Sequence, residues 1–95
     1  IPEMYALEVN NYPNPFNGYT NFIFQLHHDS NVDLSIYDLR GNLIKKILND
    51  FKQSGFYKMN WNAKNQFGQE ISSGVYLYSL SINGRSYTSK LIFLK

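Results

Sequence analysis

The sequence predicts an all-β fold, an immunoglobulin-like or fibronectin-like antiparallel β-sandwich of about seven strands. Apolar residues recur with period two along nearly all of the 95 residues, and this pattern breaks at Gly, Asn and Asp. Turn signals separate short strands at intervals of roughly 8 to 14 residues, as in small sandwiches. With 43% hydrophobic residues, including eight Tyr, seven Phe and one Trp, the chain can close one core. We therefore expect a single domain.

The first expected strand, residues 5–11, leads into a proline segment that leaves the backbone few options. Each proline restricts φ to about −65°, lacks an N–H and pushes the preceding residue toward extended geometry. A helix or a central strand is thereby excluded. We expect the segment to lie along a sheet edge or to bridge two sheets, with Phe16 as its apolar anchor. The proline segment consists of Tyr12, Pro13, Asn14, Pro15, Phe16 and Asn17.

The next elements are strands at residues 20–26 and 32–37, separated by the polar turn 27–31. Residues 38–42 turn the chain, and Gly41 with Asn42 suits positive φ, so a hairpin into a strand at 43–48 is expected. The apolar spacing between residues 39 and 51 also fits an amphipathic helix. We favour a strand because Gly41 and Asn42 interrupt the start of that helix and Ile44 and Ile47 have fair strand propensity.

The second half of the chain continues the pattern. Residues 49–54 are expected to form a polar connection in which Phe51 covers one end of the core. The strand at 55–61 places Trp61 in the core, and residues 62–69 form a loop with its sharpest bend at Gly68. Strands at 74–82 and 87–94 are joined by Asn83 and Gly84, a strong signal for a two-residue hairpin.

Composition and charge exclude several classes of function. The net charge is +2 and no block of like charge occurs, so nucleic-acid binding is not expected. No apolar run approaches the roughly 18 residues of a membrane span, and no signal-peptide pattern opens the chain. The absence of Cys removes disulfides and thiolate sites. The abrupt start at Ile1 suggests a domain excised from a longer protein.

The sequence provides no convincing metal, cofactor or catalytic site. His27 and His28 are adjacent, so on a strand they point to opposite faces, and no other His or Cys completes a zinc site. Residues 29–33 resemble the start of a calcium loop but lack its glycine and bidentate glutamate. The loop 62–70 ends on one carboxylate, and no serine lies in a nucleophile elbow. Nothing places Asp33 with Asp38, or Asp50 with Glu70, across a cleft.

Exposed tyrosines offer one alternative binding function. Tyrosines on one sheet face can stack on sugar rings, although in small sandwiches they more often cover the core. The sequence leaves both interpretations open. The candidate tyrosines are Tyr19, Tyr37, Tyr76, Tyr78 and Tyr87.

Five blocks, in order and spanning nearly the whole chain, resemble the type A C-terminal sorting domain of the type IX secretion system. The middle blocks are also similar to the immunoglobulin-like domain of flagellar hook-capping proteins, so the proline segment and the final strand favour the sorting domain. The blocks are residues 12–17, residues 32–41 ending on Gly41, Trp61 with Asn62, residues 73–78 with Gly74, Val75 and Tyr76, and residues 90–95.

Two departures from the family pattern are modest. Trp61 is followed by Asn62 and Ala63 where Asp and Gly are usual, which weakens any case for a cation in that loop, and Gly18 and Tyr19 replace a common Pro-Thr. The resemblance implies a non-enzymatic, monomeric address domain at the end of a longer cargo protein. It implies passage through the periplasm and outer membrane, recognition by the outer-membrane secretion machinery, and removal or surface attachment by a surface protease. No cofactor is implied.

The last strand is the expected recognition element. At a sheet edge it would expose backbone donors and acceptors to an added strand. Alternation would bury one apolar pair and leave the other for a partner, unless both pairs are buried; the sequence leaves this open. A different class of function, a structural spacer or glycan-binding module beside a catalytic domain, is the alternative. The recognition residues are Lys90, Leu91, Ile92, Phe93, Leu94 and Lys95.

Overall fold

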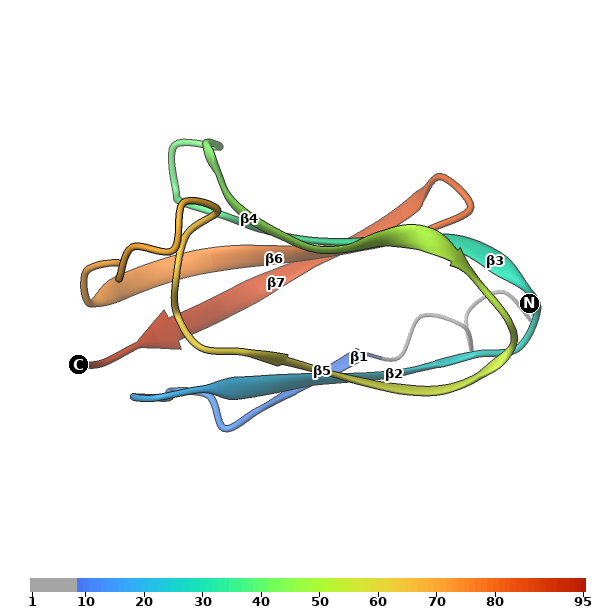
Figure 1. Cartoon of the computed structure of the whole chain (residues 1–95), viewed down its shortest axis with the longest axis horizontal. Helices are drawn as coiled ribbons and strands as arrows, with labels where there is room; N and C mark the ends of the chain where they lie inside the picture. Colours follow the sequence, from blue (N-terminus) through green and yellow to red (C-terminus); the bar gives the residue numbers. More distant parts are fainter. Residues whose placement is uncertain (1–8) are drawn as a thin grey trace.

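A computed structural model describes residues 9–95, which form two antiparallel sheets packed face to face (Figure 1). One sheet has the order β1-β2-β5 and the other β4-β3-β6-β7. The predicted seven-stranded sandwich is confirmed. No helix able to cross a membrane occurs in residues 9–95. The strands are β1 (Val9–Tyr12), β2 (Thr20–Leu26), β3 (Ser30–Tyr37), β4 (Leu43–Lys52), β5 (Gly55–Trp61), β6 (Gly74–Ile82) and β7 (Arg85–Phe93).

The core lies between the sheets and is filled by alternate residues of the inner strands. Burial follows period two along β2 and β6, and along β3 except at Ser35, which is buried as well. Phe22 meets Tyr78 across the core edge to face, with ring centroids 5.0 Å apart. Trp61 is buried as predicted, and its indole N–H donates to the Lys64 carbonyl. Fully buried side chains include Phe22, Phe24, Leu26, Leu34, Ile36, Leu80 and Leu91.

The predicted hairpin at Asn83 and Gly84 is confirmed. Both residues have positive φ, 51° and 84°, which a two-residue turn of the matching twist requires. The Asn83 side chain also accepts the Asn31 N–H, while the Asn83 N–H donates to the Asn31 carbonyl. The hairpin is thus tied to the start of β3.

β4 is a strand and not a helix, but it is longer than predicted. It runs to Lys52, so the expected polar connection at 49–54 is largely strand, and Phe51 is exposed rather than covering the core. The register with β3 skips Ile47 and Ile44, which are two bulge residues. Each bulge shifts the side chains that face the core, and this explains why the apolar spacing resembled a helix.

The first predicted strand, 5–11, is only partly described. β1 begins at Val9 and pairs with β2, whereas residues 5–8 of the predicted strand lie outside the described range. The last predicted strand, 87–94, begins two residues earlier, at Arg85.

The proline segment bridges the two sheets. β1 pairs with β2, and the chain then crosses so that Phe16 forms a parallel bridge with Phe93 at the edge of β7. Both X-Pro bonds, before Pro13 and Pro15, are cis. The fully buried Thr20 hydroxyl donates to the Pro13 carbonyl at 2.7 Å and accepts from the Asn11 side chain. One hydroxyl thereby fixes the point at which the chain leaves the first sheet.

Replacing Phe16 should cost more stability than replacing an equally large exposed residue. Phe16 is 3% exposed and contacts Phe93 and Trp61, with ring centroids 5.0 and 5.9 Å away. We expect Phe16→Ala to lower the free energy of unfolding by about 3 to 5 kcal/mol. The matched variant Phe67→Ala, at a loop residue 78% exposed, should change it by about 0.5 kcal/mol or less. Urea unfolding measures both, and equal losses would contradict the anchoring role of Phe16.

Candidate functional site

β7 is an edge strand, as expected for a recognition element, and its backbone groups alternate between two directions. The register with β6 is continuous from the pair Arg85 and Ile82 to the pair Phe93 and Gly74. In the two-residue hairpin, Arg85 faces β6, so the odd-numbered residues of β7 bond to β6 and the even-numbered residues face outward. Lys90, Ile92 and Leu94 therefore direct their N–H and C=O groups away from the sheet.

The proline segment occupies those outward groups between residues 90 and 94. The Asn14 side chain donates to the Lys90 carbonyl at 3.2 Å and accepts the Ile92 N–H at 3.0 Å, as the backbone of a neighbouring strand would. Phe16 continues the ladder: its N–H donates to the Ile92 carbonyl at 3.0 Å, and its carbonyl accepts the Leu94 N–H at 2.8 Å. We call Asn14 and Phe16 the edge cap.

The edge cap corrects one expectation from the sequence. An incoming strand cannot pair with β7 between residues 90 and 94 unless it displaces the edge cap, because four of the outward groups there are already bonded. The side chains do alternate: Leu91 is fully buried and Phe93 is 5% exposed, whereas Leu94 is 52% exposed. One apolar pair locks the sandwich, and of the other pair Leu94 is available to a partner while Ile92 is half-buried.

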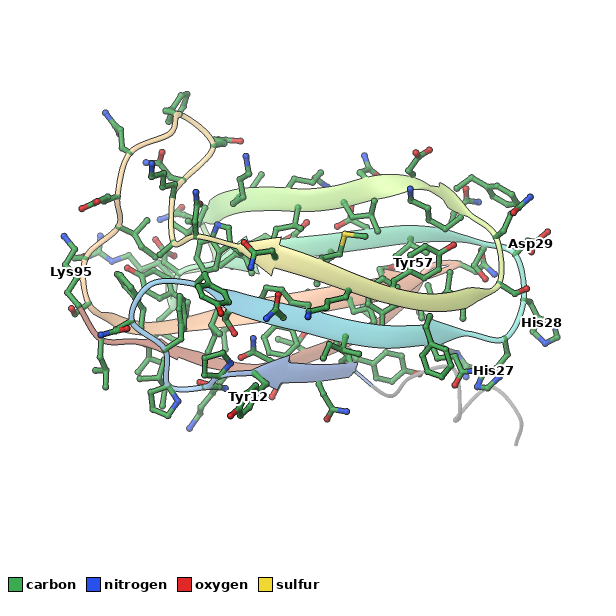
Figure 2. All side chains as sticks on the ribbon, turned by 60° about the horizontal axis from the view of Figure 1, so that its bottom comes forward. Tyr12, His27, His28, Asp29, Tyr57 and Lys95 are labelled. Carbon is green, nitrogen blue, oxygen red and sulfur yellow. The ribbon has the colours of Figure 1, made fainter. Side chains whose placement is uncertain are left out.

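The exposed part of this site lies at one end of the sandwich, where Figure 2 shows Lys95. A shallow hollow of about 390 Å³ lies there, and it is lined by residues of the proline segment together with Leu94 and Lys95. The Lys95 N–H donates to the Ser73 hydroxyl at 2.9 Å, and its ammonium lies 3.7 Å from the Glu70 carboxylate. We call the hollow and its rim the end surface. It is formed by Pro13, Pro15, Phe16, Asn17, Leu94 and Lys95.

The other family-motif residues have structural positions. Gly41 has φ 91° in the turn after β3, and its N–H donates to the Asp38 carbonyl. Tyr76 is buried, and its hydroxyl donates to the Ser72 carbonyl at 2.6 Å. Gly74 and Val75 begin β6 opposite Phe93 and Ile92, so they position the strand that carries the end surface.

Of the two interpretations left open for the tyrosines, the structure supports core cover and not a glycan platform. Tyr76 and Tyr78 are 7% and 4% exposed, with their rings in the core. Burial raises the pKa of Tyr78, with a smaller opposing effect from its hydrogen bond with Ser89. Among the five candidates Tyr19 is exposed, whereas Tyr37 and Tyr87 are half-buried, so no continuous stacking surface forms from this set.

The polar candidates for chemistry lie apart from the end surface. Figure 2 shows His27, His28 and Asp29 at the opposite end of the sandwich from Lys95. The Asp29 carboxylate accepts the Ser54 N–H at 2.9 Å and so links two turns. Among residues 9–95, no group of three or more His, Cys, Asp and Glu side chains is placed to hold a metal ion.

Two aspartates stabilise local structure. Partial burial acts to raise the pKa of Asp33, but hydrogen bonds from Lys46 and Ser35 and the Lys46 charge together outweigh it and lower the pKa. The pKa of Asp38 is lowered chiefly by the backbone N–H of Asn42. The Asp38 carboxylate also accepts from the Arg40 N–H at 2.9 Å and closes the turn between β3 and β4.

Sequence reasoning identified the residues of the end surface as two separate blocks and missed their contact. The proline after Asn14 predicts an extended backbone there, but the sequence does not predict that the Asn14 amide takes the place of a strand residue beside β7. The available signal was an Asn between two prolines. Pro13 and Pro15 lack N–H donors, and the amide side chain of Asn14 between them offers both a donor and an acceptor. Ser73, which holds Lys95, carried no such signal.

The chain matches one family. The sequence profile described as "Secretion system C-terminal sorting domain" matches residues 10–94. No curated protein sequence matches the chain.

Two solved structures are similar in fold. One is dimeric latent PorU from Porphyromonas gingivalis, with a TM-score of 0.72 and 26% identity over 90% of this chain and 9% of that chain. The other is PorZ, described as an essential surface component of the type-IX secretion system of the same organism. It has a TM-score of 0.61 and 22% identity over 92% of this chain and 11% of that chain. The chain thus spans about a tenth of each protein.

Removing the Asn14 side chain should open the edge of β7 locally. Asn14→Ala leaves the Lys90 carbonyl and the Ile92 N–H to solvent, and we expect a loss of about 1 kcal/mol of stability together with faster hydrogen exchange at the Ile92 amide. Asn17→Ala, at an exposed neighbour, is the control and should leave exchange at Ile92 unchanged. Equal exchange at Ile92 in all three proteins would contradict the role of Asn14.

The Asp33 and Lys46 pair predicts a pH dependence of stability. Because the folded-state pKa of Asp33 lies below its ordinary value of 3.8, the ionised form stabilises the fold above that pH, and this contribution is lost as the pH falls through the lower folded-state pKa. Asp33→Asn should therefore cost stability at pH 7, by about 1 kcal/mol or less since the pair is partly exposed. The difference from the unsubstituted protein should vanish in strong acid, as measured by urea unfolding across pH. A difference that does not change with pH would exclude the ionic contribution.

Proposed function

The chain belongs to the family of secretion system C-terminal sorting domains, and on that basis we propose that residues 1–95 form one folded, non-catalytic sorting domain. In this proposal the domain directs an upstream cargo protein across the outer membrane by the type IX secretion system. The outer-membrane machinery is the partner, and the domain acts as a monomer. The cargo reaches the cell surface or the medium through the periplasm.

The end surface supports this proposal most directly. It brings four residues of the proline segment together with Leu94 and Lys95 in one patch, and these belong to the first and last of the blocks that distinguish the family resemblance. Leu94 is 52% exposed beside two prolines, and Lys95 adds a positive charge. Exposed apolar side chains with a rigid backbone are suited to recognition because little conformational entropy is lost on binding.

Recognition in this proposal uses side chains and surface shape rather than an added strand. The edge cap already satisfies the outward backbone groups from the Lys90 carbonyl to the Leu94 N–H. Of the six recognition residues, Leu91 and Phe93 act from the core by holding β7 in place. The side chains that reach the surface are those of Lys90, Ile92 and Leu94. Lys95 lies next to Leu94 in the end surface.

After translocation, we propose that a surface protease separates the domain from its cargo, which is released or attached to the cell surface. In this role the domain is recognised and then cleaved from the cargo, and it needs no cofactor of its own for either step. Its task is to remain folded until that point, and a closed core with a capped edge suits such a task.

An export assay tests the proposal. Residues 1–95 are fused behind a signal peptide and a fluorescent reporter in a bacterium that has a type IX system. We expect the reporter outside the cell, and we expect Leu94→Glu to reduce export about tenfold, the effect of losing about 1.4 kcal/mol of binding. Phe56→Glu, at an exposed residue of β5 in the other sheet, is the matched control and should be exported normally.

Circular dichroism and urea unfolding of the purified variants establish that both remain folded. Deleting residues 90–95 is not a suitable test, because it would remove the buried Leu91 and Phe93. Normal export of a folded Leu94→Glu fusion would refute recognition through the end surface, and retention of the unsubstituted fusion inside the cell would refute the sorting function.

A further inference from the structure

β7 has a second half whose outward backbone groups are not occupied by the edge cap. The alternation along β7 is unbroken, so Ser86 and Thr88 direct both their N–H and C=O groups outward, as does the Lys90 N–H. Within residues 9–95 none of these groups has a hydrogen-bond partner. The stretch from Arg85 to Ser89 is about 17 Å long, since a strand rises about 3.4 Å per residue. We call it the open edge.

Among the other edge strands of the described chain, β1 and β4 show protective features that residues 86–89 lack, and β5 carries the exposed Lys58. β1 has four residues and runs into Pro13, and β4 carries two bulges together with Lys45 and Lys46. The Ile44 carbonyl on β4 also accepts the Gln66 N–H at 2.9 Å. Charges, prolines and bulges are the usual means by which proteins prevent edge pairing. Residues 86–89, in contrast, are Ser, Tyr, Thr and Ser, with no proline, bulge or charge.

The same edge already accepts an added segment. Phe16 pairs in parallel with Phe93 through two backbone hydrogen bonds, at 3.0 and 2.8 Å. The geometry of β7 is therefore competent for strand addition, and the open edge continues that pairing surface directly. Asn14 marks the boundary because its side chain binds the Lys90 carbonyl.

Charge at the two ends of the open edge restricts the partner. Arg85 and Lys90 are exposed, and neither forms an ion pair with a carboxylate among residues 9–95. Between them the side chains are neutral. Tyr87 is half-buried on the core side, whereas Ser86 and Thr88 lie on the outer side.

We propose that the open edge binds an extended polypeptide segment by strand addition, and that this segment has alternating apolar and polar residues with acidic residues at its ends. The apolar side chains pack beside Tyr87 at the flank of the sandwich, and the polar side chains align with Ser86 and Thr88. The acidic ends pair with Arg85 and Lys90. This site is separate from the end surface and does not depend on the sorting function.

Two synthetic peptides test the site on the 95-residue chain. Both contain alternating valine and threonine, and one is flanked by aspartate while the other is flanked by lysine. In the free chain the Ser86 and Thr88 amides should exchange quickly, whereas the Tyr87 and Leu91 amides, which face β6, should exchange slowly. The aspartate-flanked peptide should protect Ser86 and Thr88 from exchange and bind at least about tenfold more tightly than the lysine-flanked peptide.

Two variants test which features of the open edge account for peptide binding. Thr88→Pro removes an outward N–H without breaking a bond to β6, so the fold should persist while peptide binding falls at least about tenfold. Thr88→Val is the matched control and should bind as the unsubstituted chain does. Combining Arg85→Glu with Lys90→Glu should reverse the preference toward the lysine-flanked peptide, which tests the site without a proline.

Four results would overturn the proposal. Slow exchange at Ser86 and Thr88 in the free chain would show that the edge is already paired. Unchanged peptide binding by folded Thr88→Pro, or peptide protection located elsewhere in the chain, would exclude strand addition at the open edge. Equal binding of the two peptides by the unsubstituted chain would exclude the acidic partner.

Discussion

The crossing of the backbone between the two sheets at the proline segment is the constraint on which the rest of the structure depends. The connections β2–β3, β4–β5 and β5–β6 also pass between the sheets, but here the main chain runs from the end of β1 at Tyr12 to pair with the edge of β7 at Phe16. Thr20 fixes the point of departure through Pro13, and Phe16 fixes the arrival by packing on Trp61 and Phe93. The relative position of the sheets along this flank is set by covalent geometry as well as by packing.

This crossing also determines how the edge of β7 is used. Two prolines remove the donors that would otherwise continue a strand, so the crossing segment binds β7 at isolated positions and not along a full ladder. The Asn14 amide compensates because it offers one donor and one acceptor at the spacing of a peptide group. The apolar half of β7, around Leu91 to Leu94, is covered, and the hydroxyl-rich half is left to solvent. The apolar half of β7 thus contributes to the stability of the fold, whereas the hydroxyl-rich half stays accessible.

Period-two patterning predicted most strands because their inner faces are regular. β2 and β6 matched the expected bounds, since apart from Thr20 at the start of β2 the buried residues there are apolar or aromatic. β4 departs from the pattern because bulges at Ile44 and Ile47 change which side chains face the core, and a sequence pattern does not contain the partner strand that creates a bulge. The extension of β4 through Asn49 and Asp50 likewise depends on pairing with β3, which overrides weak strand propensity.

The site was less predictable than the fold because it depends on contacts between distant parts of the chain. The sequence did not decide between a glycan platform and core cover for the tyrosines; Tyr76 and Tyr78 point inward on β6, which depends on the register of the four-stranded sheet. The contact between Asn14 and β7 has no local signature. Its hydrogen bonds join residues separated by 76 and 78 positions, nearly the whole length of the chain.

That separation has a consequence for an address read from the end surface. Pro13 and Pro15 meet Leu94 and Lys95 only after both sheets have formed and β7 has docked against β6. Bringing residues so far apart in the sequence together costs conformational entropy, which burial of the core must offset. The end surface is therefore absent from a partly folded chain. A linear signal at residues 94–95 would be readable at any stage. In the proposed recognition, a composite surface makes binding conditional on complete folding of the domain, which gives a physical reason for a sorting signal in the form of a whole sandwich rather than a short peptide.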